Sequence, residues 1–205
     1  IQREQRSETY PVAERFVNLF EKVDGPIVVP SGSCAAMVRN YYGDLFRDDA
    51  ELADRAKRVG ERLFELTEFI NQFFGTDAIY GEREGALTYH KCCHLLREIG
   101  VDEQPIQLLR NIKGLDFYPL ERADVCCGFG GAFSIKMPDI SSAILDEKLD
   151  FIEANGSSTV VAGDTGCIYQ MQGGLRRRGS DVQVLHISQV LAESIRNSNT
   201  SEEKL

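Results

Sequence analysis

The sequence lacks the features that would assign it to several specialised classes of protein. No apolar run approaches the about 18 residues that a membrane-spanning helix needs. No charged and apolar leader of the secretory type opens the chain. The net charge of −9 argues against a nucleic-acid surface, which requires a basic stripe. We therefore expect a cytoplasmic globular protein that has no transmembrane segment and binds no nucleic acid.

Cysteine is also scarce, because six in 205 residues are too few for a disulfide scaffold. The short Cys-x-x-Cys pairs of zinc ribbons are absent, and Gly128-Phe129-Gly130-Gly131 does not match a dinucleotide-binding fingerprint. What is present is an adjacent pair, Cys126-Cys127, directly before this glycine-rich turn. Such a turn lets the chain pass close to a bulky object. Clustered cysteines of this kind indicate metal binding or redox chemistry.

Alternating apolar strands and amphipathic helices predict an α/β fold with mostly parallel sheets flanked by helices. We expect strands at 26–30, 86–90, 115–120, 158–162 and 182–185. We expect helices at 11–24, 35–42, 48–74, 95–99, 105–112, 139–154, 166–178 and 187–195. Residues 1–10 and 197–205 are polar and predicted to be unstructured, and 75–85 is predicted to be a loop. Every cysteine follows a predicted strand, so all six are expected at the carboxyl ends of strands, where ligands of such sheets bind.

An internal repeat indicates two similar lobes. Residues 27–34 and 159–167 each form an apolar strand, a small polar turn and a cysteine that opens a helix. We therefore divide the chain into residues 1–43, the second half of a first repeat whose opening half is absent, and 85–197, a second repeat. Residues 44–84 form a helical connection, and 198–205 form a polar tail.

The second repeat carries four cysteines on three turns, Cys93, Cys126, Cys127 and Cys167. Four thiolates suit either an iron–sulfur cluster or zinc. Widely separated ligands with an adjacent pair favour a larger object than a single ion. The helices that follow Cys93 and Cys167 present backbone N–H groups, which favour an anionic cluster.

The other candidate residues admit several roles. Cys34 and Cys92 are either small buried apolar residues or further ligands, and Cys92 is a spare thiol or an alternative ligand. His90 and His94 are candidates for catalysis. They can equally be metal ligands, proton carriers, hydrogen-bond donors to ligands or structural histidines. Because His90 belongs to a predicted strand, the two need not share a helix face.

Four segments resemble the lactate utilization protein A family of CCG-type cysteine-rich proteins. They are Pro30-Ser-Gly-Ser-Cys34, Thr88-Tyr-His-Lys-Cys-Cys-His-Leu-Leu-Arg97, Cys126-Cys-Gly-Phe-Gly-Gly131 and Leu175-Arg-Arg-Arg-Gly179. One of the subunits of heterodisulfide reductase is of the same type, and the iron–sulfur subunits of glycolate oxidase and anaerobic glycerol-3-phosphate dehydrogenase are more distant relatives. The resemblance covers most of the chain.

This resemblance implies two CCG repeats, each of the form Cys…Cys-Cys…Cys-x-x-Cys, that hold iron–sulfur clusters. It also implies a role in oxidising L-lactate to pyruvate with partner iron–sulfur proteins. The sequence departs from the pattern because Ser31 and Asp164 stand where the closing Cys-x-x-Cys has its first cysteine. The second repeat thus retains four matching cysteines and the first only Cys34.

The leading hypothesis is an electron-transfer subunit of an oxidoreductase acting on lactate or a related 2-hydroxy acid, with a 4Fe-4S type cluster on the four cysteines. Other iron–sulfur subunits of a lactate-oxidation complex are the expected partners. One alternative is a zinc-binding structural or assembly subunit. The other is a thiol redox enzyme like the heterodisulfide reductases.

Overall fold

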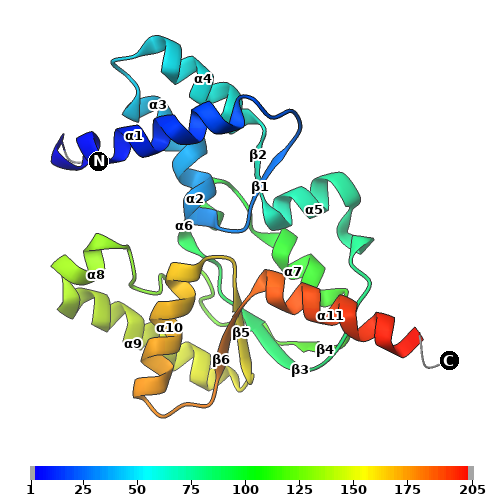
Figure 1. The fold of residues 1–205 in the computed structure, drawn as a ribbon. Coiled ribbons are helices and arrows are strands. Elements are labelled where there is room, and N and C mark those ends of the chain that lie inside the picture. Colours follow the sequence, from blue (N-terminus) through cyan, green and yellow to red (C-terminus); the bar gives the residue numbers. More distant parts are fainter. Residues whose placement is uncertain (1–2, 203–205) are drawn as a thin grey trace. The chain divides into compact units, whose positions relative to one another are not determined.

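The computed structural model describes residues 3–202, apart from the side chains at positions 3–6, 78 and 199–202. The chain divides into two compact units, Ile1–Leu66 and Thr67–Leu205. In each unit helices flank parallel strands, which confirms the predicted α/β class (Figure 1). Within the described residues, no helix is long and apolar enough to cross a membrane.

The first unit is built on a two-stranded parallel sheet. Strand β1 (Ile27–Val29) pairs along its length with β2 (Leu63–Glu65). The helices of this unit are α1 (Arg3–Phe20), α2 (Gly32–Ala36), the π-helical η1 (Met37–Tyr41), α3 (Tyr42–Leu45) and α4 (Ala50–Glu61). Their buried faces include Val17, Leu45 and Leu52.

Two helix predictions for the first unit are wrong. Helix α1 does not begin at Pro11 but continues back to Arg3, with the proline inside it. A proline removes one backbone hydrogen bond without always ending a helix. The expected single helix over 48–74 is interrupted, because α4 ends at Glu61 and α5 (Leu66–Phe74) follows strand β2. Residues 63–65 form a strand because the backbone groups of β1 need hydrogen-bond partners. The helical spacing of the apolar residues in 48–74 gives no sign of this pairing.

The second unit contains a wholly parallel four-stranded sheet in the order β4-β3-β5-β6. The strands are β3 (Glu82–Tyr89), β4 (Lys113–Phe117), β5 (Thr159–Ala162) and β6 (Gln183–His186). Helices α9 (Pro138–Asn155) and α10 (Thr165–Arg177) cover one face, and α7 (Glu103–Arg110) and α11 (Ile187–Glu202) cover the other (Figure 1). The short elements are η2 (Thr76–Ala78), α6 (Cys93–Glu98) and α8 (Ala132–Lys136).

Strand β5 is buried at all four of its positions. Its side chains alternate between two apolar cores, as expected for a central strand of a parallel sheet. Val160 packs in the core that contains Leu149 and Met171, whereas Val161 packs in the core that contains Leu109 and Ile187. The sheet is therefore enclosed on both faces, and its carboxyl edge is left to the loops that carry the cysteines.

Three local predictions for the second unit differ from the structure. Strand β3 begins at Glu82, inside the segment expected to be a loop, and helix α8 was not expected at all. Helix α11 continues through the predicted tail to Glu202, because no glycine or proline stops it after Ile195. The rest of the predicted tail, 203–205, lies outside the described residues.

Strand β2 supplies a stability test for the first unit. The Leu63 side chain is 1% exposed, so Leu63→Ala should lower the free energy of unfolding by about 2–5 kcal/mol through lost burial and a residual cavity. Leu19 in α1 is 60% exposed and provides the matched control. Leu19→Ala should change stability by no more than about 0.5 kcal/mol. Urea unfolding measures both, and equal effects would contradict the assignment of Leu63 to a buried strand.

Candidate metal centre

Five of the six cysteines meet at the carboxyl edge of the four-stranded sheet. Cys92 and Cys93 come directly after β3, and Cys167 lies in the first turn of α10, after β5. Cys126 and Cys127 belong to an irregular loop that begins after β4 and runs to α8. The three segments are far apart in sequence, and the parallel order of the strands brings them to one edge.

The five thiols form a continuous chain of neighbours. Each thiol interacts with the next in the order Cys92, Cys167, Cys127, Cys126 and Cys93. Cys92, Cys127 and Cys167 are buried, whereas Cys93 and Cys126 are partly exposed. The chain of sulfur atoms therefore runs from the core of the unit toward its surface. Cys92, expected to be either a spare thiol or a ligand, lies at the inner end.

One sulfur in this chain is strongly acidic. The thiols of Cys127 and Cys93 interact with Cys126, and the Gly128 N–H donates to its Sγ at 3.3 Å. These donors lower the pKa of Cys126 to about 2. The pKa values of Cys93 and Cys127 are raised, in each case first by the interaction with Cys126. The group therefore presents a ready thiolate, the form of cysteine that binds metals.

At the inner end, the pKa of the Cys167 thiol is raised. The Cys127 thiol acts to lower it, but Cys92, burial and the nearby Asp164 outweigh that interaction. Burial disfavours the charged form of a thiol in general. Proton release from this end thus needs a compensating positive charge such as a bound metal ion.

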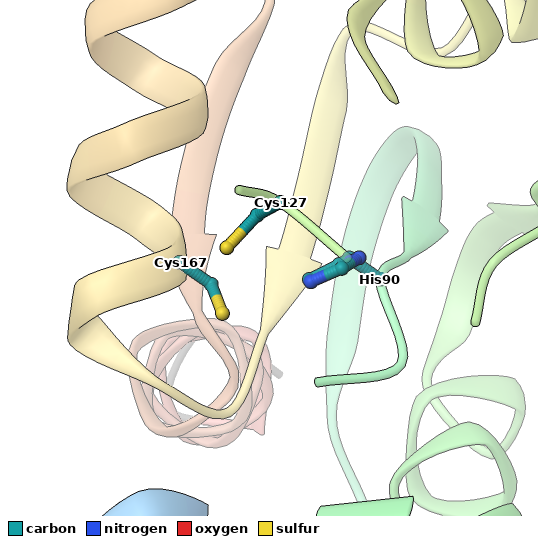
Figure 2. Close-up of side chains that lie close together, drawn as sticks. All are labelled: His90, Cys127 and Cys167. Carbon is teal, nitrogen blue, oxygen red and sulfur yellow. The ribbon is translucent and has the colours of Figure 1, made fainter. Parts of the chain in front are cut away.

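His90 lies beside this inner end. One of its ring nitrogens and the sulfur atoms of Cys127 and Cys167 all lie within 4.8 Å of one another. Figure 2 shows the three side chains directed toward the same space. Burial, followed by the Lys148 ammonium, lowers the pKa of His90 to about 3. The Cys126 sulfur and the Ala123 carbonyl act in the opposite direction, but the ring makes no hydrogen bond within the described part of the chain. The imidazole is therefore neutral at pH 7.

His94 occupies a different position. It lies in α6, where its Nδ1 is 3.6 Å from the Cys93 Sγ and its Nε2 is 3.6 Å from a Glu98 carboxylate oxygen. His90 precedes α6, so the two histidines do not share a helix face. His94 is thus associated with the outer end of the thiol chain and His90 with the inner end.

A buried lysine supports the loop that carries Cys126 and Cys127. The Lys148 side chain projects from α9, and its Nζ donates to the carbonyl oxygens of Arg122 at 2.8 Å and Ala123 at 3.3 Å. Arg122 has a φ of 48°, a strained value for a residue with a side chain. The ammonium helps to hold this strained turn in place. Arg97 donates to the next carbonyl, that of Asp124, at 3.1 Å.

Sequence reasoning missed Lys148, although a signal was present. Within the helix predicted at 139–154, Leu145, Leu149 and Ile152 mark the buried face by their helical spacing, and Lys148 lies on that same face. Lysine is almost never fully buried unless its charge is paired or solvated by polar groups. A lysine on the apolar face of a helix beside a cysteine-rich loop was therefore a candidate for support of the site.

Position 128 requires glycine because the backbone there packs closely against helix α9. Its φ is +83°, and a Cβ at this position would lie 2.4 Å from the Ser141 carbonyl oxygen in α9. The Ser141 hydroxyl donates to the Gly128 carbonyl at 2.8 Å and accepts from the Gln170 side-chain amide at 3.2 Å. The glycine expected to let the chain approach a bulky object thus approaches helix α9. This contact locates the paired cysteines.

Asp164 and Ser31, which replace an expected cysteine in the two repeats, have the same structural role. Each is the N-cap of the helix that follows, α10 or α2, with extended backbone angles. The Asp164 carboxylate accepts from the Gly166 N–H at 3.1 Å, and the Ser31 hydroxyl accepts from the Cys34 N–H at 3.5 Å. This local similarity is consistent with two repeats.

Cys34 belongs to the first unit and is exposed at the start of α2. The other five cysteines belong to the second unit. The role of Cys34 as a ligand in a remnant first-repeat site stays a prediction.

The fold and the site together define a cysteine-rich domain of the CCG type. The profile of that family, described as "Cysteine-rich domain", matches residues 87–172, a range that contains all five clustered cysteines and His90. Lactate utilization protein A 2 of Bacillus cereus (strain Q1) is 38% identical over 183 residues, which cover 89% of this chain and 75% of that protein. Lactate utilization protein A of Geobacillus sp. (strain WCH70) is 40% identical over 178 residues, with coverage of 87% and 74%. The chain belongs to the lactate utilization protein A family.

The packing of Gly128 yields a paired test. Gly128→Ala should destabilise the protein through strain at positive φ, about 1–2 kcal/mol, and through the clash with Ser141, about 1–3 kcal/mol more. Gly156→Ala is the control, because Gly156 has a φ of +78° but open space around it. Chemical unfolding should therefore show the larger loss for Gly128→Ala. Equal losses would show that the loop does not press against α9 as described.

The buried His90 predicts a pH dependence of the metal-free protein. The pKa is about 3 in the folded chain against an ordinary 6.5, so the unfolded chain binds a proton that the folded chain does not between these values. Stability should fall as pH decreases through this window, by about 1.4 kcal/mol per pH unit from this group. His90→Asn should remove that part of the slope in urea unfolding, whereas the control His186→Asn should keep it. Identical slopes for His90→Asn and the unmodified protein would contradict this prediction.

Proposed function

We propose that this chain is an iron–sulfur redox subunit of a multi-protein complex that oxidises L-lactate to pyruvate in the cytoplasm. The observation that carries the proposal is the set of five thiols that meet at one sheet edge, among which the pKa of Cys126 is strongly lowered. A role in lactate utilization is supported by the names of the relatives, which cover most of this chain. The other subunits are expected to be iron–sulfur proteins.

The donor set fits an iron–sulfur cluster, and Cys93, Cys126, Cys127 and Cys167 are the proposed ligands of a 4Fe-4S type centre. When bound, such a cluster supplies a one-electron couple. The residues around it have defined tasks. The Gly128 N–H donates to the Cys126 sulfur, and hydrogen bonds to ligand sulfurs tune the reduction potential. Lys148 supplies positive charge near Cys126 and Cys127.

A zinc-binding structural subunit is the second candidate, because one observation favours it. A His90 ring nitrogen and the Cys127 and Cys167 sulfur atoms lie within 4.8 Å of one another, a compact set that suits a single ion better than a larger cluster. Zinc accepts both imidazole and thiolate ligands. The two candidates differ in the metal that the protein retains and in whether the centre can be reduced.

Metal analysis after anaerobic purification tests the proposed centre. We expect iron and acid-labile sulfide in comparable amounts and a visible absorption band that bleaches on reduction. Cys126→Ser and Cys127→Ser should each lose most of the iron, because they remove the central thiols of the chain. Cys34→Ser, which alters the exposed cysteine of the other unit, should retain it. Colourless protein with stoichiometric zinc would overturn the iron–sulfur assignment.

The role in lactate oxidation needs a separate test in the source organism. Deletion of the gene should abolish growth on L-lactate and leave growth on glucose unchanged. Reintroduction of the unmodified gene should restore growth on L-lactate, and the Cys127→Ser gene should not, because its product lacks the redox centre. Normal growth of the deletion strain on L-lactate would contradict the proposed function.

A further inference from the structure

His90 is held at the end of β3 by the sheet itself. Its backbone N–H donates to the Val161 carbonyl at 2.9 Å, which continues the β3–β5 pairing beyond Tyr89. Its side chain is 0% exposed. The position of the imidazole is therefore set by the most central pair of strands in the unit, and the ring is enclosed by protein.

The imidazole lies near two thiols and the Ala123 carbonyl, yet it makes no hydrogen bond to any residue that the structure describes. Among the described residues, neither ring nitrogen of His90 has a hydrogen-bond partner. A buried polar group without a partner costs about 1–3 kcal/mol, so native proteins rarely retain one without a reason. The other two histidines are different, because His186 Nδ1 lies 2.7 Å from the Ser188 hydroxyl and His94 Nδ1 contacts Cys93. A metal ion at the sulfur atoms of Cys127 and Cys167 would give His90 the partner that it lacks.

We propose that His90 is a ligand of the metal centre, which then has mixed imidazole and thiolate coordination. The inference rests on the proposed function, since it adds a ligand to the same site. Cys92 is the competing candidate for this inner position. Its thiol already has two partners, the His90 carbonyl oxygen at 3.8 Å and Cys167, so it does not need a metal to satisfy it.

Imidazole ligation changes the charge of the centre. Compared with a thiolate at the same position, a neutral imidazole leaves the centre with one negative charge fewer, which makes reduction of an iron–sulfur centre easier. Clusters in which histidine replaces cysteine have higher reduction potentials for this reason. His90 would thus set the potential at which the centre accepts electrons, and a thiolate at the same position would lower it.

The test uses anaerobically prepared full-length protein grown with either ¹⁴N- or ¹⁵N-labelled histidine. Pulsed electron paramagnetic resonance of the reduced protein should show a nitrogen coupling that changes with the isotope. His90→Cys should retain iron, lose this coupling and have a lower reduction potential. His90→Ala should lose iron several-fold. The matched control, His186→Asn, should keep iron, coupling and potential.

Two contrary results separate this inference from the proposed function. An iron-loaded protein with no histidine coupling, together with full iron in His90→Ala, would overturn the ligation by His90 and leave the iron–sulfur function standing.

If the protein retains zinc, the redox function fails, and X-ray absorption at the zinc edge then decides ligation. A nitrogen neighbour that is lost in His90→Cys supports the inference, and all-sulfur coordination in the unmodified protein overturns it. If His90→Ala does not fold, the nitrogen measurement on the unmodified protein decides.

Discussion

Strands β3 and β5 run parallel at the centre of the four-stranded sheet, and their pairing places Tyr89 opposite Val161. The hydrogen bond from His90 to the Val161 carbonyl extends this pairing to the point where both strands end. The residues that follow β3 and those that open α10 must therefore lie side by side. A slip of the register would separate His90 and Cys92 from Cys167, and it would turn the side chains of β5 into the wrong cores.

The third group of cysteines does not follow directly from a strand end. Cys126 and Cys127 come after a long irregular loop, and its position depends on helix α9 on two sides. Lys148 holds the carbonyls of Arg122 and Ala123 before the cysteines, and Ser141 meets Gly128 after them. Helix α9 thus fixes the position of this loop, whereas strand pairing fixes the segments that follow β3 and β5. The burial of a lysine is tolerated because its ammonium is hydrogen-bonded to carbonyl oxygens.

The same enclosure gives the site its chemistry. Burial disfavours free thiolates, so the inner sulfur atoms keep their protons until a cation replaces them. Cys126 is partly exposed, and interactions with the Cys127 and Cys93 thiols and the Gly128 N–H lower its pKa. The two ends of the site therefore differ. The pKa of Cys126 is lowered at the outer end, whereas the pKa of Cys167 is raised at the inner end, beside the neutral imidazole of His90.

The success of sequence reasoning depended on whether the signal was local. Strand β5 and helix α10 were predicted closely, because a continuous apolar run, an N-cap and a helical pattern are all written in neighbouring residues. The prediction of one helix over 48–74 was wrong because Leu63–Glu65 forms a strand only by pairing with β1, which is far away in the chain. Lys148 was missed for a similar reason, since its partners are carbonyl groups of a loop that no periodicity places beside α9.

The sequence by itself determined the α/β class, the family and the cysteines that follow strands, because periodicity, composition and motifs are properties of the chain. Only the tertiary structure decided the order of the thiols from core to surface, the inclusion of Cys92 and the unpartnered imidazole of His90. These depend on strand order, register and the packing of α9, which join segments far apart in sequence. The paired cysteines that stand out in the sequence are thus the middle of a site whose two ends were set by folding.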